Sequence, residues 1–425
     1  MDVTLTTADG SATVSGGFQY LASAQIFPAV GALDAIVYDQ MRQKLYVSNQ
    51  DHNRVEIFDL TSNTFLSPVT VGNQPLALAL TPDDSLLAVV NSGDGTVSVI
   101  DPVKLQVIAT DSVLTASDQG AGCGGVAFDL APAAPHGMLV DINCTALLSN
   151  GTFHLLNLDT NSLSCAGVAG CAPDGTDLIY DNGLAAMAST PDGSKIFLAG
   201  TSLIGGQTVG LLDLTANTLT IGFQGVFADA AVDADASIFA ASFAIANPQL
   251  FEIGIMTDLG ITDAGAQSFN NVFGEKLNPS GSLLFVPQNS GVDIFDVHQG
   301  RLALHVATPE PIPADTNTMA LDETGSKMFL ISNSGLTIAQ LFKVPLSLAT
   351  VNPSSGSPGS QVTFRGSGFQ NGATVTWGTS TTAVTFVDAN TLQAVVPAVS
   401  SGTLRVTVTN PNSDQYTFDA AFTVN

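Results

Sequence analysis

The chain has 425 residues with 37 acidic and 11 basic side chains, which gives a formal net charge of −26. Charged residues are only 11% of the chain, against about 25% in a typical soluble domain, so the negative charge reflects scarce Lys and Arg rather than excess acid. This composition excludes nucleic acid and anionic lipid as partners, since both require clustered basic groups. Intrinsic disorder and a membrane span are also excluded, because 45% of the residues are hydrophobic but no apolar run approaches the roughly 20 residues that a bilayer needs.

The N-terminal segment 3–21 is similar in sequence to the C-terminal segment 406–424. VTLTTADGSATVSGGFQYL aligns with VTVTNPNSDQYTFDAAFTV with one residue of gap, which places Phe18 over Phe422. Residues 1–21 are therefore predicted to be the final strand pair of a domain like the C-terminal one. Two interpretations stay open: the chain is cut from a longer protein, which we favour, or residues 2–21 are completed by a partner chain in self-association. The start MDVTLTTADG lacks the features of a signal peptide.

One unit recurs between residues 34 and 343 with a period near 42. Its first half is an apolar strand, a turn and a second strand, as in LALALTPDDSLLAVVN (76–91). Its second half is a third strand closed by Asp, a turn and a fourth strand, as in TVSVIDPVKLQVI (96–108). Four short strands per unit of about 40 residues are typical of a β-propeller blade. Seven units can be counted, at 34–72, 74–115, 122–171, 183–225, 227–268, 272–312 and 315–343.

The seventh unit lacks an outer strand of its own. After LTIAQLFK (336–343) the chain passes directly to VPLSLATVNP, which belongs to the next domain. The apolar segment 22–29 precedes the first unit and is predicted to pair with the seventh, because an unpaired edge would invite aggregation. The propeller is therefore expected to span residues 22–343.

The repeat resembles a known family. Tyr46, Val47, Ser48 and Asn49, followed by VEIFDLTSNT and TPDDSLLAVVN, resemble the YVTN-type seven-bladed β-propeller repeats of extracellular bacterial and archaeal proteins. This resemblance implies a bacterial or archaeal protein that is secreted or bound to the cell surface. Similar propellers occur in lactonase-like and quinoprotein-like enzymes, which is where an enzymatic interpretation would enter.

Four cysteines favour an oxidising compartment. Cys123 and Cys144 flank a predicted hairpin in which residues whose numbers sum to about 267 would face each other, so the two sulfurs would be opposite. Cys165 and Cys171 enclose a short loop. The even count without histidine companions predicts two disulfides rather than a zinc site, with buried free thiols as the alternative.

Residues 344–425 differ in composition, being rich in Ser, Thr, Gly and Val, and they contain Trp377, the single Trp of the chain. The run NPSSGSPGSQVTFRGSGFQNGATVTWG (352–378), with TLQAVVPA and GTLRVTVTNPNSDQYTFDAAFTV, resembles an IPT/TIG domain, an immunoglobulin-like β-sandwich. Such domains usually act as spacers or as adhesion and binding modules. The predicted fold class is therefore all-β: a seven-bladed β-propeller plus an immunoglobulin-like β-sandwich.

The sequence contains few candidates for chemistry. The five histidines show no metal-ligand spacing and no nucleophile motif is present, so no catalytic residue, metal or cofactor is expected. The pair Asp233 and Asp235 could hold calcium, but it coincides with a repeat turn, which is the preferred interpretation. Loops that join second to third strands gather on one face of a propeller around its channel. Those of the first two units supply the candidate ligand-binding residues Asp51, His52, Arg54 and Asp94.

These features predict a non-enzymatic binding or structural protein. The propeller would be a recognition or assembly platform on TIG spacer domains, with a protein or a carbohydrate at the cell surface as partner. Two alternatives stay open: a secreted propeller enzyme of lactonase or dehydrogenase type, and a self-assembling subunit of a surface layer or filament.

Overall fold

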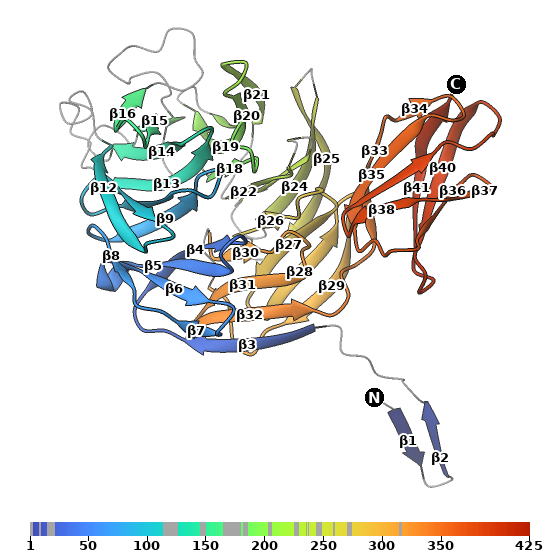
Figure 1. Ribbon diagram of the computed structural model, residues 1–425, viewed down its shortest axis with the longest axis horizontal. Helices are drawn as coiled ribbons and strands as arrows, with labels where there is room; N and C mark the ends of the chain where they lie inside the picture. Colours follow the sequence, from blue (N-terminus) through green and yellow to red (C-terminus); the bar gives the residue numbers. More distant parts are fainter. Residues whose placement is uncertain are drawn as a thin grey trace.

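The computed structural model describes residues 3–7, 10–14, 22–113, 126–144, 150–164, 180–181, 186–202, 206–224, 229–234, 236, 238–243, 249–257, 260–269, 274–313 and 317–425. These residues form β-strands and turns, and the one helix among them is the 3-10 helix η1 (Gln50–His52). Within these ranges, then, no helix has the length and apolar character to cross a membrane. The chain is all-β, with a large body of small sheets and a separate C-terminal sandwich (Figure 1).

The described residues of the large body form seven antiparallel sheets, which are numbered here in chain order. Sheet 1 comprises β4 (Leu33–Asp39), β5 (Lys44–Asn49), β6 (Arg54–Asp59), β7 (Thr64–Phe65) and β8 (Val69–Thr70). Sheet 2 comprises β9 (Pro75–Leu80), β10 (Leu87–Asn91), β11 (Thr96–Asp101) and β12 (Gln106–Ser112). Sheet 3 comprises β13 (Val126–Ala133), β14 (Gly137–Cys144), β15 (Asn150–Asn157), β16 (Ser162–Ser164) and β17 (Tyr180–Asp181).

The remaining four sheets follow the same order of strands. Sheet 4 comprises β18 (Ala186–Ser189), β19 (Lys195–Ser202), β20 (Gly206–Asp213) and β21 (Thr218–Gln224). Sheet 5 comprises β22 (Asp229–Val232), β23 (Ile238–Phe243), β24 (Gln249–Thr257) and β25 (Gly260–Phe269). Sheet 6 comprises β26 (Lys276–Leu277), β27 (Leu283–Gln288), β28 (Gly291–Asp296) and β29 (Arg301–Ala307). Sheet 7 comprises β30 (Met319–Leu321), β31 (Lys327–Ser332), β32 (Gly335–Leu341) and β3 (Ala22–Pro28).

The first strands of successive sheets contact one another in a closed cycle, in the order β4, β9, β13, β18, β22, β26, β30 and back to β4. The ring is completed in sheet 7, where β3 pairs antiparallel with β32 and places Ala22 opposite Leu341 and Pro28 opposite Gly335. The predicted pairing of segment 22–29 with the last repeat is therefore confirmed. An N-terminal strand thus supplies the outer edge that the seventh repeat lacks.

The hydrophobic cores lie between neighbouring sheets. One core joins Leu45 and Phe58 of sheet 1 to Phe329 and Ile331 of sheet 7, all at most 2% exposed. Other cores join sheets 1 and 2, 2 and 3, 3 and 4, 5 and 6, and 6 and 7. Alternating apolar residues on the middle strands therefore stabilise the ring by packing sheet against sheet.

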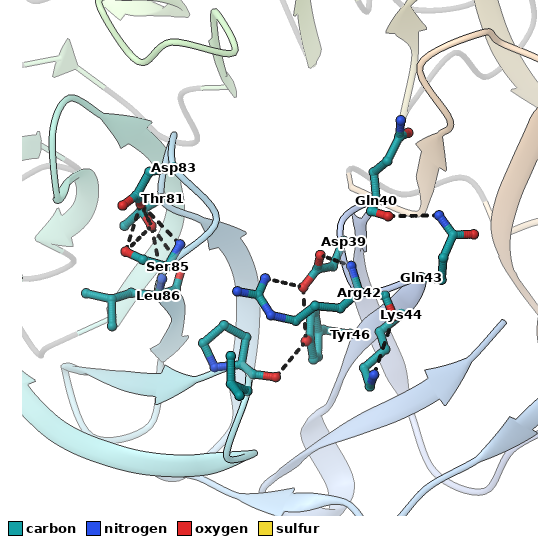
Figure 2. Close-up of polar contacts among 12 residues, drawn as sticks. Asp39, Gln40, Arg42, Gln43, Lys44, Tyr46, Thr81, Asp83, Ser85 and Leu86 are labelled. Carbon is teal, nitrogen blue, oxygen red and sulfur yellow. Dashed lines mark hydrogen bonds and ion pairs between the residues drawn. The ribbon is translucent and has the colours of Figure 1, made fainter. Parts of the chain in front are cut away.

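Short polar residues shape the turns at one end of several sheets. In sheet 2 the turn after the first strand has Asp83 accepting hydrogen bonds from Thr81 Oγ1 at 2.7 Å and Ser85 Oγ at 2.8 Å (Figure 2). The repeat in sheet 4 does the same with Thr190, Asp192 and Ser194. The Asp that ends a third strand acts similarly: Asp101 Oδ1 accepts from the backbone N–H groups of Val103 and Lys104, both at 2.9 Å. Repeated Asp residues therefore fix turns.

Asn91, which ends the second strand of sheet 2, bonds to the neighbouring third strand. Asn91 Nδ2 donates to Thr96 Oγ1 at 3.0 Å and to Ser98 Oγ at 2.9 Å, both on the third strand. Asn91 is fully buried. A buried amide needs side-chain partners within the sheet, so it reaches across to the neighbouring strand instead of capping its own turn.

The hairpin of β13 and β14 differs from the predicted register. Val126 faces Asn143 and Leu130 faces Val140, so facing residues sum to 269 and 270 rather than 267. The register shifts between Ala127 and Leu130, and the turn lies at residues 134–136, beyond the expected centre. Cys123, Cys165 and Cys171 lie outside the described residues, and Cys144 ends β14. The two disulfides therefore stay predictions.

The C-terminal sandwich consists of two sheets. One contains β33 (Ser347–Asn352), β35 (Gln361–Ser367), β39 (Thr391–Val395) and β38 (Thr385–Asp388). The other contains β34 (Ser355–Gly356), β41 (Gln415–Val424), β40 (Gly402–Thr409), β36 (Thr374–Trp377) and β37 (Ser380–Ala383). Trp377 is fully buried between Phe364 and Phe422, with ring centroids 5.5 and 5.1 Å away in edge-on geometry. The single Trp therefore anchors the sandwich core.

The N-terminal residues form a strand pair, β1 (Val3–Thr7) with β2 (Gly10–Val14). Its register follows the predicted similarity to the end of the sandwich. Val3 faces Val14, and the aligned residue Val406 faces Phe418. The next three facing pairs of β1 and β2 also align with the next three pairs of β40 and β41, if one residue of gap is placed in the turn. Sequence similarity and strand register therefore agree for this segment.

Candidate functional site

The predicted residues Asp51 and Asp94 occupy equivalent positions in sheets 1 and 2, where the second strand leads to the third. Asp51 Oδ2 accepts a hydrogen bond from the backbone N–H of Ala32 at 2.9 Å. Asp94 Oδ2 accepts one from the backbone N–H of Asn73 at 2.5 Å. Ala32 and Asn73 both belong to segments that enter the first strand of a sheet. Each carboxylate thus fixes the entry of its sheet.

His52 and Arg54 belong to a small network in sheet 1. His52 Nδ1 lies 3.0 Å from Asn49 Oδ1, and Asn49 Nδ2 donates to Glu56 Oε1 at 2.7 Å. Arg54 Nε donates to the same Glu56 oxygen at 2.6 Å. Glu56 is 6% exposed, so the Arg54 guanidinium neutralises a buried carboxylate. The structure places Asp51 and His52 in η1, with Arg54 beside them at the start of β6, and it places Asp94 in the corresponding loop of sheet 2. Their ligand-binding role stays a prediction.

A cavity of about 580 Å³ lies on the axis of the ring and is lined by the first strand of every sheet. Its walls are mainly apolar, with Leu78, Leu80, Met187 and Leu321 among the lining residues. Toward the end where first strands lead to second strands, the lining becomes polar and acidic and includes Asp84, Asp322 and Glu323. The predicted residues are at the opposite end of the sheets.

The acidic end of the cavity, which we call the acidic rim (Asp84, Asp322 and Glu323), raises the pKa of ionisable groups near it. Partial burial raises the pKa of Asp84, and the nearby carboxylates of Asp39, Asp83 and Glu323 raise it further, while Arg42 opposes them. Burial and the charges of Asp322 and Glu323 likewise raise the pKa of Tyr38, against the hydrogen bond from Gln43. The rim therefore carries a negative potential that favours cations.

A hydrogen bond spans the axis at the other end of the cavity. Asn317 Nδ2, from the segment preceding β30 in sheet 7, lies 3.2 Å from Asp129 Oδ1 on β13 in sheet 3. Sheets 3 and 7 are not neighbours in the ring, so this bond crosses the channel. The cavity is thus bridged at this end and acidic at the other.

Lys276 is a basic residue of the cavity wall that the sequence analysis did not single out. Lys276 lines the wall from β26, where the equivalent residues of the other sheets are Ala or Val. An alignment of the seven repeats at their first turns would have shown this, since EKLNPSG puts Lys where the second repeat has Ala79. Lys276 is one of the 11 basic residues of the chain, and it lines the cavity.

The propeller and the sandwich share a polar junction. Tyr416 of β41, 4% exposed, donates its hydroxyl to Asp296 Oδ1 at 3.0 Å, at the end of the third strand of sheet 6. Burial raises the pKa of Tyr416, and the charge of Asp296 raises it further. Ser347 Oγ donates to the carbonyl of Ser282 at 3.2 Å, and both residues are fully buried. These bonds fix β33 and β41 against sheet 6.

Further contacts surround this junction. The His298 ring packs edge-on against Phe418 with centroids 3.9 Å apart, although the residue as a whole is exposed. Desolvation lowers the pKa of His298, although Asp296 and Asp419 oppose the effect. Lys343 Nζ lies 2.6 Å from Asp414 Oδ2, and Asn390 Nδ2 donates to the carbonyl of Glu323 at 2.9 Å. The sandwich therefore contacts sheets 6 and 7 beside the acidic rim.

A different polar contact joins sheets 2 and 3. His136 Nε2 lies 2.9 Å from Asp83 Oδ2, and His136 Nδ1 lies 3.0 Å from both oxygens of Asp159. Hydrogen bonds to Asp83 and Asp159 raise the pKa of His136. For Asp83, partial burial raises the pKa. Hydrogen bonds from Thr81, His136 and Ser85 outweigh this effect and keep the pKa of Asp83 well below its usual range. Ser85 Oγ also lies 3.4 Å from His136 Nε2.

Metal binding finds no support within the described residues, where no group of three or more potential ligands forms a site. Asp233 accepts a hydrogen bond from the backbone N–H of Ile238 at 3.0 Å, in agreement with the preferred turn interpretation. Its predicted companion Asp235 lies outside the described residues.

Comparisons with known proteins agree with this architecture. Structural similarity links the chain to a hydrazine synthase chain from Kuenenia stuttgartiensis, with a TM-score of 0.56 and 16% identity over 74% of this chain and 97% of that one. The β-propeller domain of Cps50 (Swd1) from Myceliophteria thermophila also has a TM-score of 0.56, with 9% identity over 75% of this chain and 98% of that one. Such identities show the fold alone. No curated protein matches the chain. Residues 346–424 match the family model of the IPT/TIG domain, so the chain combines a β-propeller with an immunoglobulin-like IPT/TIG domain.

Proposed function

We propose that the protein is a non-enzymatic binding or structural protein of the bacterial or archaeal cell surface or extracellular space. In this proposal the ring is a seven-bladed propeller of YVTN-type repeats that recognises a protein or a carbohydrate. The TIG domain serves as a rigid spacer that sets the orientation of the propeller.

The junction between the two modules carries this proposal. Domains that move independently usually meet through small, polar, solvated contacts. Here, a buried tyrosine bonds to a carboxylate at the end of sheet 6, and two fully buried serines bond across the boundary. A fixed orientation suits a recognition platform held away from an anchor, because it reduces the orientational freedom lost on binding.

The composition supports an extracellular role. With 11 basic residues in 425, the chain has few cations available for surface ion pairs. The proposed disulfides, Cys123 with Cys144 and Cys165 with Cys171, would suit an oxidising compartment. Mass measurement with and without reduction tests them: a gain of four hydrogen atoms on reduction supports both bonds, and four free thiols in the untreated protein would refute them.

A paired experiment tests the function. The purified chain is applied to a glycan array and to a panel of cell-envelope proteins, and in parallel it is assayed for lactone hydrolysis and for quinone-dependent dehydrogenation. We expect saturable binding to one class of surface molecule and no turnover. Turnover above the buffer rate that depends on the protein would overturn the non-enzymatic proposal in favour of a secreted propeller enzyme.

Self-assembly through the N-terminal strands is a second candidate, favoured by the register of β1 and β2. The equivalent strand β40 pairs with β36 on its other edge, whereas β1 pairs only with β2 among the described strands. A strand from a second copy could take the place of β36. Light scattering of the full chain and of a variant without residues 2–21 tests this: oligomers that disappear in the variant support it, and a monomeric full chain refutes it.

A further inference from the structure

The axial cavity owes its size to a ring of small side chains. The residue two positions before the first turn is equivalent in all sheets, because it pairs with the corresponding residue of the second strand. In sheets 1 and 2 these pairs are Val37 with Tyr46 and Ala79 with Ala88. The same position holds Ala131, Ala188, Ala231 and Ala320 in four other sheets. All six residues line the cavity. We call these six residues, together with the equivalent residue of sheet 6, the middle ring. Small residues at one level leave space on the axis.

Lys276 is the seventh member of the middle ring and its only charged one. It pairs with Phe285 as Ala320 pairs with Phe329, so its position in the repeat is unambiguous. Lys276 is half-buried and lines the cavity. No hydrogen bond or ion pair is recorded for its ammonium group among the described residues. A cation in an apolar wall without a carboxylate partner costs free energy, and an anion that enters the cavity would recover it.

The two ends of the cavity have opposite charge preferences. Lys276 lies two residues before the turn of sheet 6, or roughly 7 Å below it at about 3.3 Å per residue along a strand. At the turn level are the carboxylates of the acidic rim, two of them on sheet 7 beside sheet 6. An anion alone would be repelled at the rim, and a cation alone would be repelled by Lys276.

From this arrangement we infer that the cavity binds a small zwitterion of the size of a short peptide. Its carboxylate meets the ammonium of Lys276 at the middle ring, and its ammonium group meets the acidic rim. Apolar side chains of the ligand pack against Leu80, Leu277 and Leu321 between the two levels. Apolar walls with a few converging polar groups are typical of ligand pockets, and a dipeptide fits easily within about 580 Å³. The inference goes beyond the proposed function and does not depend on it.

Calorimetric titration with three matched probes tests the inference. The probes are the dipeptide Leu-Leu, its N-acetyl form, which lacks the ammonium group, and its C-terminal amide, which lacks the carboxylate. We expect Leu-Leu to bind and each blocked form to bind at least about tenfold more weakly, since one charge-assisted contact is worth about 1.4 kcal/mol or more. Absence of Leu-Leu binding to the unmodified chain at millimolar concentration would overturn the inference.

Two variants assign the contacts. Lys276→Met should weaken Leu-Leu about tenfold and leave the affinity for the amide unchanged, because the amide makes no contact with the ammonium. Glu323→Gln should weaken Leu-Leu and the amide but not the N-acetyl form. Lys104→Met is the matched control, since Lys104 pairs with Asp101 on an exposed turn of sheet 2. Equal Leu-Leu affinity of the Lys276→Met variant and the unmodified chain would refute the assignment, and thermal unfolding confirms that each variant is folded.

Discussion

Two junctions in this molecule use histidine in opposite ways. Between sheets 2 and 3, His136 bridges the carboxylates of Asp83 and Asp159 at the surface. Between the propeller and the sandwich, His298 packs its ring against Phe418. The pKa of His136 is raised by its two carboxylate partners, and that of His298 is lowered by desolvation. The comparison shows two different causes of a pKa shift: hydrogen-bonded carboxylates favour the protonated form of His136, whereas desolvation disfavours the protonated form of His298.

The two junctions should therefore respond to pH in opposite directions. The raised pKa of His136 contributes stability that is complete below the unfolded-state value of about 6.5 and is lost as pH rises through the folded-state value. The lowered pKa of His298 has the reverse effect: its junction loses stability as pH falls from about 6.5 to the folded-state value. Acidification should thus favour the contact between sheets 2 and 3 and weaken the contact between domains.

The largest effect is expected from Tyr416→Phe at the domain junction. This variant removes the hydroxyl that donates to Asp296 and leaves a buried carboxylate oxygen without that donor. The loss should be about 1–3 kcal/mol of coupling between the domains. Differential scanning calorimetry should then separate the unfolding of the TIG domain from that of the propeller, while small-angle scattering should show a wider range of domain orientations.

The control for this prediction is Tyr46→Phe, which affects a similar buried hydroxyl inside the propeller. Tyr46 Oη lies 3.3 Å from Asp39 Oδ2 and 3.4 Å from the carbonyl of Pro102 in sheet 2. Tyr46→Phe should lower the propeller transition without separating the domains. An identical calorimetric profile for Tyr416→Phe and the unmodified chain would contradict a stabilising role for this junction.

Phe418→Ala should change the titration of His298 and sharpen the comparison at the second junction. Without the phenyl ring, water reaches the imidazole, so the pKa of His298 should rise toward its ordinary value. NMR titration of the histidine Cε1 protons measures this shift, with His305 as the internal control because it pairs with Asp293 on sheet 6. The acid sensitivity of the domain junction should decrease in the variant. A pKa of His298 that stays unchanged would show that Phe418 is not the source of its desolvation.

Much of this fold could be predicted because its determinants are local. The sequence shows the repeat period, the turn-forming Asp residues and the missing outer strand of the seventh repeat. The missing strand predicted the pairing that the structure shows between β3 and β32. The centre of the β13–β14 hairpin was not visible, because an irregularity between Ala127 and Leu130 shifts the register. Such irregularities depend on packing between strands and leave little trace in the local pattern.

The candidate sites were harder to predict because they join distant parts of the chain. Tyr416 and Asp296 are 120 residues apart, and no periodicity links a residue of the sandwich to one of the propeller. Asp51 and Asp94 were predicted as ligand-binding residues from their loops on one face of the propeller; in the structure they also accept hydrogen bonds from backbone N–H groups, which the sequence pattern did not indicate. Lys276 could have been found only by asking which repeat departs from the others at one position.

A smaller effect is expected from His136→Gln at the junction of sheets 2 and 3. The side chain of His136 is 31% exposed and those of its two partners are half exposed, so the bridge should contribute no more than about 1 kcal/mol. The difference in melting temperature between the variant and the unmodified chain should be largest near pH 5 and should disappear above the raised pKa of His136. Added salt should reduce it as well. A difference that grows with rising pH would contradict the charged bridge.

The smallest effect on stability is expected from Asp159→Asn, a variant that distinguishes the contribution of Asp159 to the bridge from that of Asp83. Asp159 contacts His136 through its side chain, whereas Asp83 also accepts hydrogen bonds from Thr81 and Ser85 within its turn. Both Asp159→Asn and Asp83→Asn should therefore lower the pKa of His136, but only Asp83→Asn should measurably reduce the melting temperature. NMR titration and thermal unfolding of the two variants measure these effects separately. If Asp159→Asn destabilised the protein as much as Asp83→Asn, the bridge itself rather than the turn would stabilise this edge, and the contrast with the buried domain junction would disappear.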